Sequence, residues 1–452
     1  MFNKIRFVCM LMAVTIFVAA CQKLGVGVED VTLRPERPEK GLLSATGAGR
    51  IPTDIQGIPR VYINTPSKRG VQGIDSKRNY DANVNEWTTD CTIEIHVTTL
   101  AGKDSICYSA KGMKIRGRGN SSWTHYYRKR PYNIKLDKKA DLLGTGKTKR
   151  YLLLANWMDR TLLRNDVALE AARRTSLEWT PSGTFVEFYV DGDRRYNYWL
   201  GEKINVEETH FMADYLYSLD VSNPLKTNFI TRYGIWNKGK KAGKIPVELE
   251  YPDLDDFPDA VEPAKETLYQ LEELLYKGDW GPFVDADSFC DWFLVYELTG
   301  NAEPNHPKSV NMYIREGVLY AGPAWDFDFG TFIPDINNGL LLNQNAVYYK
   351  QLLRAPSFRE RLKKRWSVLK PRFQTLPAYV DQRADLIRES EADNHARFPC
   401  FPNPLSTDRD EKGNYTRMIN YDEQLTFQEA VDRLKYALTQ RIEQLDELIS
   451  AL

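Results

Sequence analysis

The stretch ELTGNAEPNHPKSVNMYIREGVLYAGPAWDFDFGTF, from Glu297 to Phe332, decides how the fold of this chain is interpreted. Its centre holds two short apolar runs, Met312 to Ile314 and Val318 to Tyr320, on either side of Glu316-Gly317. This pattern predicts a β-hairpin. A hairpin folds back on itself, so it brings the loop before it beside the loop after it. We therefore expect two polar loops to meet at one place.

These two loops carry the side chains of a candidate site. The second loop places Asp326 and Asp328 two residues apart after an apolar strand. The first loop supplies six more polar side chains: Glu303, Asn305, His306, Lys308, Ser309 and Asn311. Convergent oxygens suit Mg²⁺, which proteins usually hold with one or two carboxylates together with substrate phosphates. The spacing is typical of metal-assisted phosphoryl transfer, but a surface loop whose aspartates cap turns has the same spacing.

The overall composition is that of an ordinary globular protein. Of the 452 residues, 27% are charged and 42% are hydrophobic. The 61 basic residues balance 61 acidic ones, and a net charge of zero argues against a broad nucleic-acid-binding surface. We therefore expect no nucleic-acid partner.

The N-terminus has the features of a secretory signal. Lys4 and Arg6 precede an apolar run from Phe7 to Ala20, which is too short to span a bilayer as a stable helix. Val18-Ala19-Ala20-Cys21 also resembles the lipobox of bacterial lipoproteins, in which cleavage before the cysteine is followed by its lipidation. An uncleaved anchor or a plain signal peptide is the alternative.

The lipobox predicts how the chain is organised before its folded part. Residues 1–20 would be a signal peptide, and a lipidated Cys21 would hold the protein on a membrane of the cell envelope. Residues 21–55, rich in Gly, Pro, Thr and charged residues, would form a tether.

The later cysteines lack the spacing of a structural zinc site. Cys91 and Cys107 flank an expected hairpin whose turn lies near Gly102-Lys103-Asp104. An oxidising compartment allows a disulfide between them. The two cysteines are not equidistant from the turn, so two free thiols are equally compatible with the sequence.

The first part of the folded chain is rich in expected strands. One of them runs from Lys111 to Arg118 and places Arg116 and Arg118 on one face, because side chains alternate along a strand. In the segment GRGNSSW, from Gly117 to Trp123, glycines let the backbone approach an anion while guanidinium groups bind it. A glycine-rich turn with solvated arginines has the same sequence.

Two further charged residues lie on or beside expected strands. Lys135, on a strand from Pro131 to Leu136, points away from the apolar face of that strand, towards either a cleft or water. A hairpin formed by Thr184–Val190 and Tyr196–Leu200 delivers Glu202 just past its second strand.

Helices dominate the rest of the chain. Residues 223–258, rich in Gly, Lys, Asp and Pro, are expected to be irregular. Helical periodicity predicts helices at Asp159–Arg174, Glu262–Tyr276, Asp285–Leu298, Ala346–Leu353, Ser357–Lys370, Pro377–Asp393 and Thr426–Leu452. The sequence thus predicts an α+β fold with a β-rich N-terminal part and a helical C-terminal part.

Several motifs together resemble the CotH (spore coat protein H) kinase-like family. In chain order they are IRGRGNSSW from Ile115, KRPYNIKL from Lys129, YLLLANWMDRTLLRN from Tyr151, GEKIN from Gly201 and AWDFDFG from Ala324. The likeness extends roughly from Ile58 to Phe358. It implies an atypical protein-kinase-like fold, with the family domain at residues 56–360 and a helical part at 361–452 packed on it.

The resemblance also implies an activity, namely Mg²⁺-dependent transfer of phosphate from ATP to serine or threonine of a secreted or surface protein. Asp326 matches the metal-binding and catalytic aspartate, Asp328 would assist it, and Glu303 stands where members commonly have a catalytic aspartate. The remaining implied roles are nucleotide binding by Lys135 with Glu202 as its acidic partner, nucleotide binding by Arg116 and Arg118, and a metal or phosphate contact by Asn311.

A second class of function stays open, namely a non-catalytic envelope lipoprotein that binds a glycan or a surface protein. Glutamate at position 303 and the scarcity of ATP outside the cytoplasm both favour it, and ten tryptophans and 25 tyrosines are compatible with stacking on sugars. Exposed aromatics in a groove away from Asp326 would support this alternative. Acids that converge with Lys135 and Glu202 would support the kinase.

Overall fold

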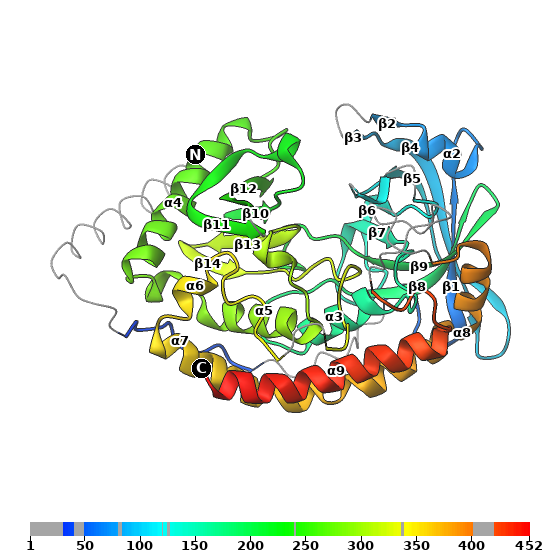
Figure 1. Ribbon diagram of the computed structural model, residues 1–452. Coiled ribbons are helices and arrows are strands. Elements are labelled where there is room, and N and C mark those ends of the chain that lie inside the picture. The colour runs from blue at the N-terminus through cyan, green and yellow to red at the C-terminus, as the bar shows by residue number, and fades with distance from the viewer. Residues whose placement is uncertain are drawn as a thin grey trace, which may run out of the picture.

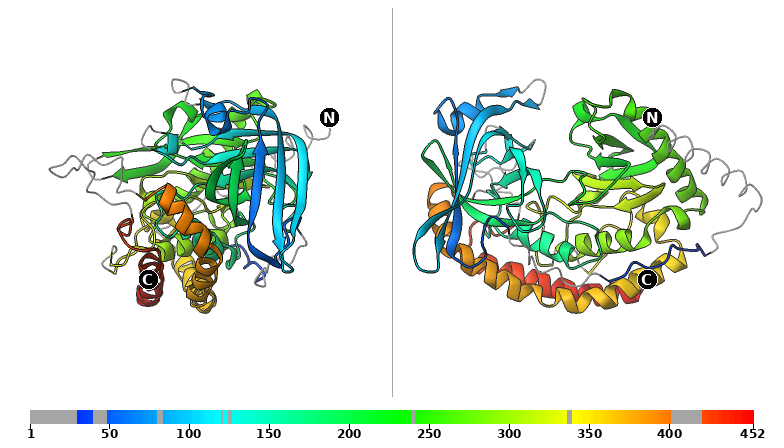
Figure 2. Two further views of the ribbon diagram at one scale, coloured as in Figure 1. Left: turned by 90° about the vertical axis from the view of Figure 1, so that its right-hand side faces the viewer. Right: turned by 180° about the vertical axis from the view of Figure 1, so that it is seen from behind.

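The computed structural model of the protein describes residues 30–39, 49–79, 84–119, 121–123, 127–238, 241–335, 339–400 and 420–452. Two β-rich lobes stand side by side on a belt of long helices (Figures 1 and 2).

The strands of the N-terminal part close into a barrel with the order β1-β4-β5-β6-β7-β9-β8. Their bounds are β1 Ile55–Asn64, β4 Thr88–Thr99, β5 Asp104–Gly117, β6 Tyr132–Ala140, β7 Thr148–Leu154, β8 Gly183–Val190 and β9 Asp193–Glu202. Side chains alternate along each strand, so every second residue fills the barrel, as Ile115, Ile134 and Tyr151 do on three neighbouring strands. The short elements α2 (Gly70–Asp75), β2 (Arg78–Asn79) and β3 (Val84–Asn85) lie beside it.

The second lobe is built on a five-stranded sheet with the order β11-β12-β10-β13-β14. The bounds are β10 Tyr215–Leu219, β11 Phe229–Lys238, β12 Lys241–Tyr251, β13 Val310–Arg315 and β14 Val318–Ala321. Strands β13 and β14 confirm the hairpin expected around Glu316-Gly317, because Arg315 pairs with Val318 across it.

The expectation that residues 223–258 are irregular is wrong, since they hold β11 and β12. The register of this pair shifts between Ile230 and Ile235. There the carboxylate of Glu272, on helix α4, accepts hydrogen bonds from the backbone amides of Arg232 (2.6 Å) and Gly234 (2.8 Å). A buried acid far along the chain completes this bulge, so the local composition did not reveal the strand.

Helices cover the sheet and connect the lobes. Their bounds are α3 Arg164–Arg173, α4 Val261–Lys277, α5 Ala286–Thr299, α6 Tyr349–Leu352, α7 Pro356–Phe373, α8 Leu376–Arg397 and α9 Phe427–Ser450. The helix expected from Asp159 begins at Arg164 instead, because the Asp159 carboxylate accepts hydrogen bonds from the amides of Thr161 and Arg164 and holds a turn before the helix. Helices α7, α8 and α9 form the belt (Figure 1), in which α8 contacts β1 and β9 of the barrel while α7 and α9 contact α5 of the second lobe.

The structure differs from the expected tether at residues 30–39, which lie along α5 and α7. The Arg37 side chain donates to Asp285 at 2.9 Å, and its backbone amide donates to Asp287 at 2.6 Å. Farther along, Glu39 pairs with Arg372 at 3.1 Å. Charges on this segment match charges on the two helices, so it is bound to the folded domain. The expected signal peptide and Cys21 lie outside the described residues.

The helices give no sign of a membrane segment in the part of the chain that the structure describes. None of them is both long enough and apolar enough to cross a bilayer.

The disulfide that the spacing of Cys91 and Cys107 allowed does not form, and both are free thiols. Strands β4 and β5 do make the expected hairpin. Its register pairs Cys91 with Met113, whereas the Cys107 thiol approaches the Ile95 carbonyl at 3.3 Å. The two cysteines are therefore placed at different positions along the ladder.

Replacing Arg441 tests how the belt is attached. Its side chain on α9 contacts the buried Glu297 carboxylate on α5 at 2.6 Å. Arg441→Met leaves that carboxylate buried without its cation, and we expect a loss of about 3–5 kcal/mol in the free energy of unfolding, measured with urea. In the control variant Lys435→Met the lost pair with Asp381 is half exposed, and the expected cost is below about 1 kcal/mol. Equal costs in the two variants would contradict this account.

Candidate active site

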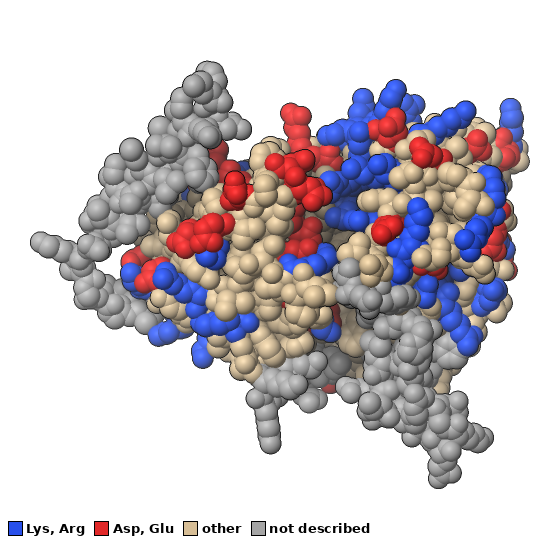
Figure 3. All heavy atoms as spheres, turned by 90° about the horizontal axis from the view of Figure 1, so that it is seen from above, with Lys and Arg blue, Asp and Glu red and all other residues tan. Residues whose placement is uncertain are grey.

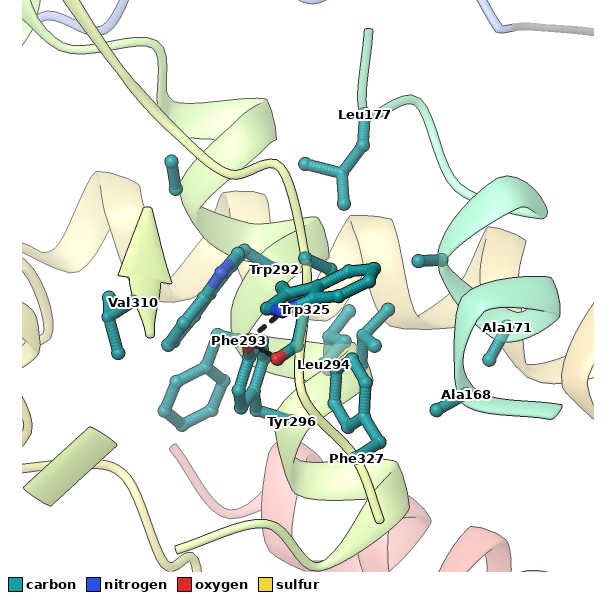
Figure 4. Packing of buried hydrophobic residues seen from close by; sticks show 14 of the residues in the cluster. Ala168, Ala171, Leu177, Trp292, Phe293, Leu294, Tyr296, Val310, Trp325 and Phe327 are labelled. Atoms are coloured by element: carbon teal, nitrogen blue, oxygen red, sulfur yellow. Dashed lines mark hydrogen bonds between the residues drawn. The ribbon is translucent and has the colours of Figure 1, made fainter. Parts of the chain in front are cut away.

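The acidic loop after β14 is built on a buried aromatic platform. Trp325 and Phe327 are 8% and 0% exposed, and both belong to the main core. The Tyr296 hydroxyl on α5 donates to the Trp325 carbonyl at 2.9 Å, and the Tyr296 ring lies 4.9 Å from that of Phe327 (Figure 4). The aromatic residues of this loop alternate with Asp326 and Asp328, whose side chains are only half-buried.

Three asparagine side chains hold the backbone of this loop. Asn301 donates to the Asp326 carbonyl at 3.1 Å, and Asn165 accepts from the Phe327 amide at 2.8 Å. The third is Asn420, which precedes α9 and is fully buried. Its amide nitrogen donates to the Asp328 carbonyl at 3.1 Å and its oxygen accepts from the Gly330 amide at 2.9 Å. Sequence reasoning missed Asn165, Asn301 and Asn420, because each acts through the backbone of a distant segment.

Glu303 joins the acids from the other loop. It opens a short 3₁₀ turn, Glu303–Asn305, and its carboxylate pairs with Lys308 at 3.4 Å. Burial raises the pKa of Glu303 to about 7, and the neighbouring Asp326 acts in the same direction. Burial likewise raises the pKa of Asp328 to about 8, with help from Asp326 and Glu303. The two loops therefore meet as the sequence predicted.

Glu303, Asp326 and Asp328 form an acid cluster, and the carboxylate oxygens of this acid cluster fit a hard divalent cation. Three mutually repelling carboxylates are a set of oxygen ligands whose repulsion a cation would relieve. Within the described residues, no group of three or more Asp, Glu, His or Cys side chains is close enough to enclose a metal by itself. This is compatible with Mg²⁺, which takes few protein ligands and fills its remaining positions with water and phosphate.

Arg118 reaches the acidic loop from the barrel. Its guanidinium group lies 5.3 Å from the centre of the Trp325 ring. Burial lowers the pKa of Arg118, while Asp326 and Asp328 act in the opposite direction because they lie nearby. Arg116, two residues earlier on β5, lies 4.3 Å over the Trp87 ring, and Glu250 is near it. The two arginines are thus brought to the junction of the lobes.

The structure does not bring Lys135 and Glu202 together. Lys135 pairs with Arg150 across β6 and β7, whereas Glu202 pairs with the next residue, Tyr151, so the two side chains leave the barrel wall on opposite faces. The Glu202 carboxylate is fully buried and accepts hydrogen bonds from Thr145 Oγ1 (2.6 Å) and the Ser182 amide (3.1 Å). The implied role of Glu202 as the acidic partner of Lys135 is therefore wrong for this chain.

The Asn311 side chain also bonds to a group other than the two aspartates of the acidic loop. Its side chain donates to the Pro323 carbonyl at 3.1 Å. No described contact joins it to Asp326 or Asp328. Asn311 thus fastens the base of the β13–β14 hairpin, and its implied metal contact has no support in this arrangement.

Two cations that sequence reasoning missed, Arg150 and Lys203, lie on the barrel side of the junction. The Lys203 amide donates to the Arg150 carbonyl at 3.0 Å, which extends the β7–β9 pairing by one residue. The electrostatic neighbours of Lys203 are Glu250, Arg150, Arg118 and Arg116. Strand alternation could have found it, because Lys203 directly follows the inward-facing Glu202. Figure 3 shows Lys and Arg gathered on one side of the junction and Asp and Glu on the other.

The tryptophans do not supply an exposed stacking surface in the described part of the chain. All ten tryptophans fall in the described ranges, and each is buried or half-buried. Among the described residues, the exposed aromatic side chains are Phe257, Phe329, Tyr421 and Tyr436, of which Phe329 and Tyr421 belong to the acidic loop or to the segment bonded to it.

Comparison with protein families agrees with the motifs. A family model described as CotH kinase protein matches residues 115–444, which is most of the chain. Among curated proteins, none matches the chain.

Asn420→Ala tests whether the C-terminal segment positions the acidic loop. The variant leaves the Gly330 amide and the Asp328 carbonyl without a partner, which costs about 1–3 kcal/mol for each group that stays buried. We expect at least a threefold loss in Mn²⁺ affinity, measured by electron paramagnetic resonance, beside the loss of stability. The control Asn394→Ala truncates a buried amide whose side-chain atoms have no hydrogen-bond partner among the described residues. The same Mn²⁺ affinity in both variants would show that Asn420 does not position the loop.

The raised pKa values of Glu303 and Asp328 predict a pH dependence of stability. In the metal-free protein these carboxyls bind protons more tightly when folded than when unfolded, where their pKa is about 4. Stability should therefore fall as the pH rises from about 4 to about 8. We expect the melting temperature of the metal-free protein to fall between pH 6 and pH 8, and Asp328→Asn to reduce that fall. If the variant and the wild type change equally, the acids are not the cause.

Proposed function

Since the chain belongs to the CotH kinase family, we propose that it is a Mg²⁺-dependent protein kinase of kinase-like α+β fold that transfers the terminal phosphate of ATP to serine or threonine. The observation that carries this proposal is the approach of Arg118, from the barrel, to Asp326 and Asp328 on the second lobe. Phosphoryl transfer requires cations on the phosphates and acids for the metal, and the junction holds both.

Each group has a role that its position supports. Asp326 and Asp328 would hold Mg²⁺, which supplies neutralisation of the developing phosphate charge. Arg116, Arg118 and Lys203 bind the phosphates and orient them towards the acids. In this proposal Lys203 takes the role that the family resemblance implied for Lys135.

Glu303 is the general base that accepts the proton of the acceptor hydroxyl. A pKa near 7 suits this role, because a base works best when its pKa is close to the working pH. Its longer side chain reaches the acid cluster from the 3₁₀ turn, so glutamate can serve where aspartate is common. The Lys308 ammonium group at 3.4 Å orients its carboxylate.

The N-terminal motif supports a place of action at the cell envelope. A lipidated Cys21 would anchor the kinase to a membrane of the cell envelope, and its acceptor would be a secreted or surface protein. Since residues 30–39 are bound to α5 and α7, only the short stretch between Cys21 and Asp30 would remain as tether. Nine residues span at most about 30 Å, so the domain would lie close to the lipid surface.

Nucleotide binding by the full chain tests the proposal. Calorimetry should show binding of ATP that requires Mg²⁺, and Asp326→Asn should weaken it at least tenfold, or about 1.4 kcal/mol. Transfer of labelled phosphate to protein should fall by about a hundredfold or more in the same variant. The exposed Asp279→Asn is the matched control and should bind like the wild type. A folded wild type that binds no Mg²⁺-ATP would overturn the proposal.

A further inference from the structure

Four cations lie side by side across four neighbouring strands of the barrel. Lys114 pairs with Lys135 across β5 and β6, and Lys135 pairs with Arg150 across β6 and β7. Lys203 follows at the end of β9, with its amide bonded to the Arg150 carbonyl. We call these four residues the basic row. Its members alternate with inward-facing core residues such as Ile115, Ile134 and Tyr151, so the row lies on the outer face of the barrel.

Without a bound anion, the like charges of the basic row destabilise the folded protein. Like charges placed directly opposite each other across strands are destabilising. Among the described residues, Arg150 is the member of the row that forms an ion pair. Its partner is Asp253 at 3.9 Å, which is close to the longest distance at which two charged groups count as an ion pair. Burial lowers the pKa of Lys135, and the neighbouring Arg150, Lys114 and Lys149 lower it further. A surface of this kind gains stability when an anion binds along it.

The row leads to the acid cluster. Lys203 lies near Arg118 and Arg116, and Arg118 in turn lies near Asp326 and Asp328. An anion on the row would therefore end where the proposed phosphoryl transfer takes place. Lys and Arg are suited to phosphate oxygens, Arg through paired donors and Lys as a point charge.

The spacing of the cations favours a chain of phosphates over an acidic polypeptide. Neighbouring strands are about 4.8 Å apart, which sets the spacing of the row. On an extended peptide, the side chains of one face recur only every 6.6–6.8 Å or so. A ligand with a negative charge on each short repeat matches the row better.

We propose that the basic row binds a linear polyphosphate chain, whose end reaches Arg118 and the acid cluster. The chain is an inorganic polyphosphate, because the four cations cover three strand intervals of about 4.8 Å each, which is more than the three phosphates of a nucleotide can span. The position of its end rests on the proposed kinase function, whereas binding along the row does not.

Calorimetry on the full chain with Mg²⁺ tests the proposal with four probes: ATP, tripolyphosphate, long-chain inorganic polyphosphate and poly-glutamate. The double variant Lys114→Gln/Lys135→Gln removes the outer half of the row. The control Lys111→Gln/Lys138→Gln removes two exposed lysines from the same two strands. Both variants keep Arg116, Arg118 and Lys203.

We expect the outer-row variant to weaken long-chain polyphosphate about tenfold, the control to weaken it less than twofold, and poly-glutamate to bind at least tenfold more weakly than polyphosphate. ATP and tripolyphosphate are too short to reach all four cations, so we expect the outer-row variant to weaken them less than twofold. An equal loss for these short ligands would show that the row does not bind a long chain and would overturn the proposal.

Equal losses in the two double variants would overturn the proposal, as would poly-glutamate binding that matches polyphosphate. The outcomes also separate the two proposals. If ATP does not bind, while polyphosphate binds and is weakened in the outer-row variant, the proposal of an ATP-dependent kinase is wrong and the proposed polyphosphate site is retained. If ATP binds with Mg²⁺ but the outer-row variant binds polyphosphate as tightly as the wild type, the proposed polyphosphate site is wrong and the proposed kinase function is retained.

Discussion

The candidate site depends on the burial of two aromatic residues. Trp325 and Phe327 must enter the core above α5, and alternation along the loop then places Asp326 and Asp328 on the other side. α5 is buried over its whole length and supplies the hydroxyl of Tyr296 that holds the Trp325 carbonyl. Two acids are thus kept side by side, although burial and the neighbouring Asp326 raise the pKa of Asp328. The free energy that this costs comes from the packing of the aromatic rings.

The second requirement is a fixed distance between two lobes of opposite local charge. The barrel presents arginines and lysines, and the second lobe presents the acids (Figure 3). The belt connects them, because α8 contacts the barrel while α7 and α9 contact α5. Arg164 strengthens this connection, since it is fully buried, pairs with Asp422 before α9 at 2.6 Å and donates to the Thr331 carbonyl at 3.0 Å. The C-terminal helices therefore help to hold the two lobes in the arrangement that forms the site.

The sequence predicted what depends on local pattern. Alternation and turn residues gave the barrel strands, the β13–β14 hairpin, most helices and the meeting of Glu303 with Asp326. What depends on distant partners was missed. Strands β11 and β12 have their bulge completed by Glu272, residues 30–39 bind to helices much later in the chain, and Asn420 acts through the backbone of Asp328. The predicted pairing of Glu202 with Lys135 was wrong because a family motif does not show on which face of the barrel wall a side chain lies.

A crystal structure of the full chain with Mg²⁺ and a non-hydrolysable ATP analogue is the most direct test of the central claim. We expect the metal to be bound by Asp326 and Asp328, and the phosphates to contact Arg118 and Lys203 at the junction of the lobes. A nucleotide bound elsewhere, or a metal that these two carboxylates do not touch, would contradict the proposed function.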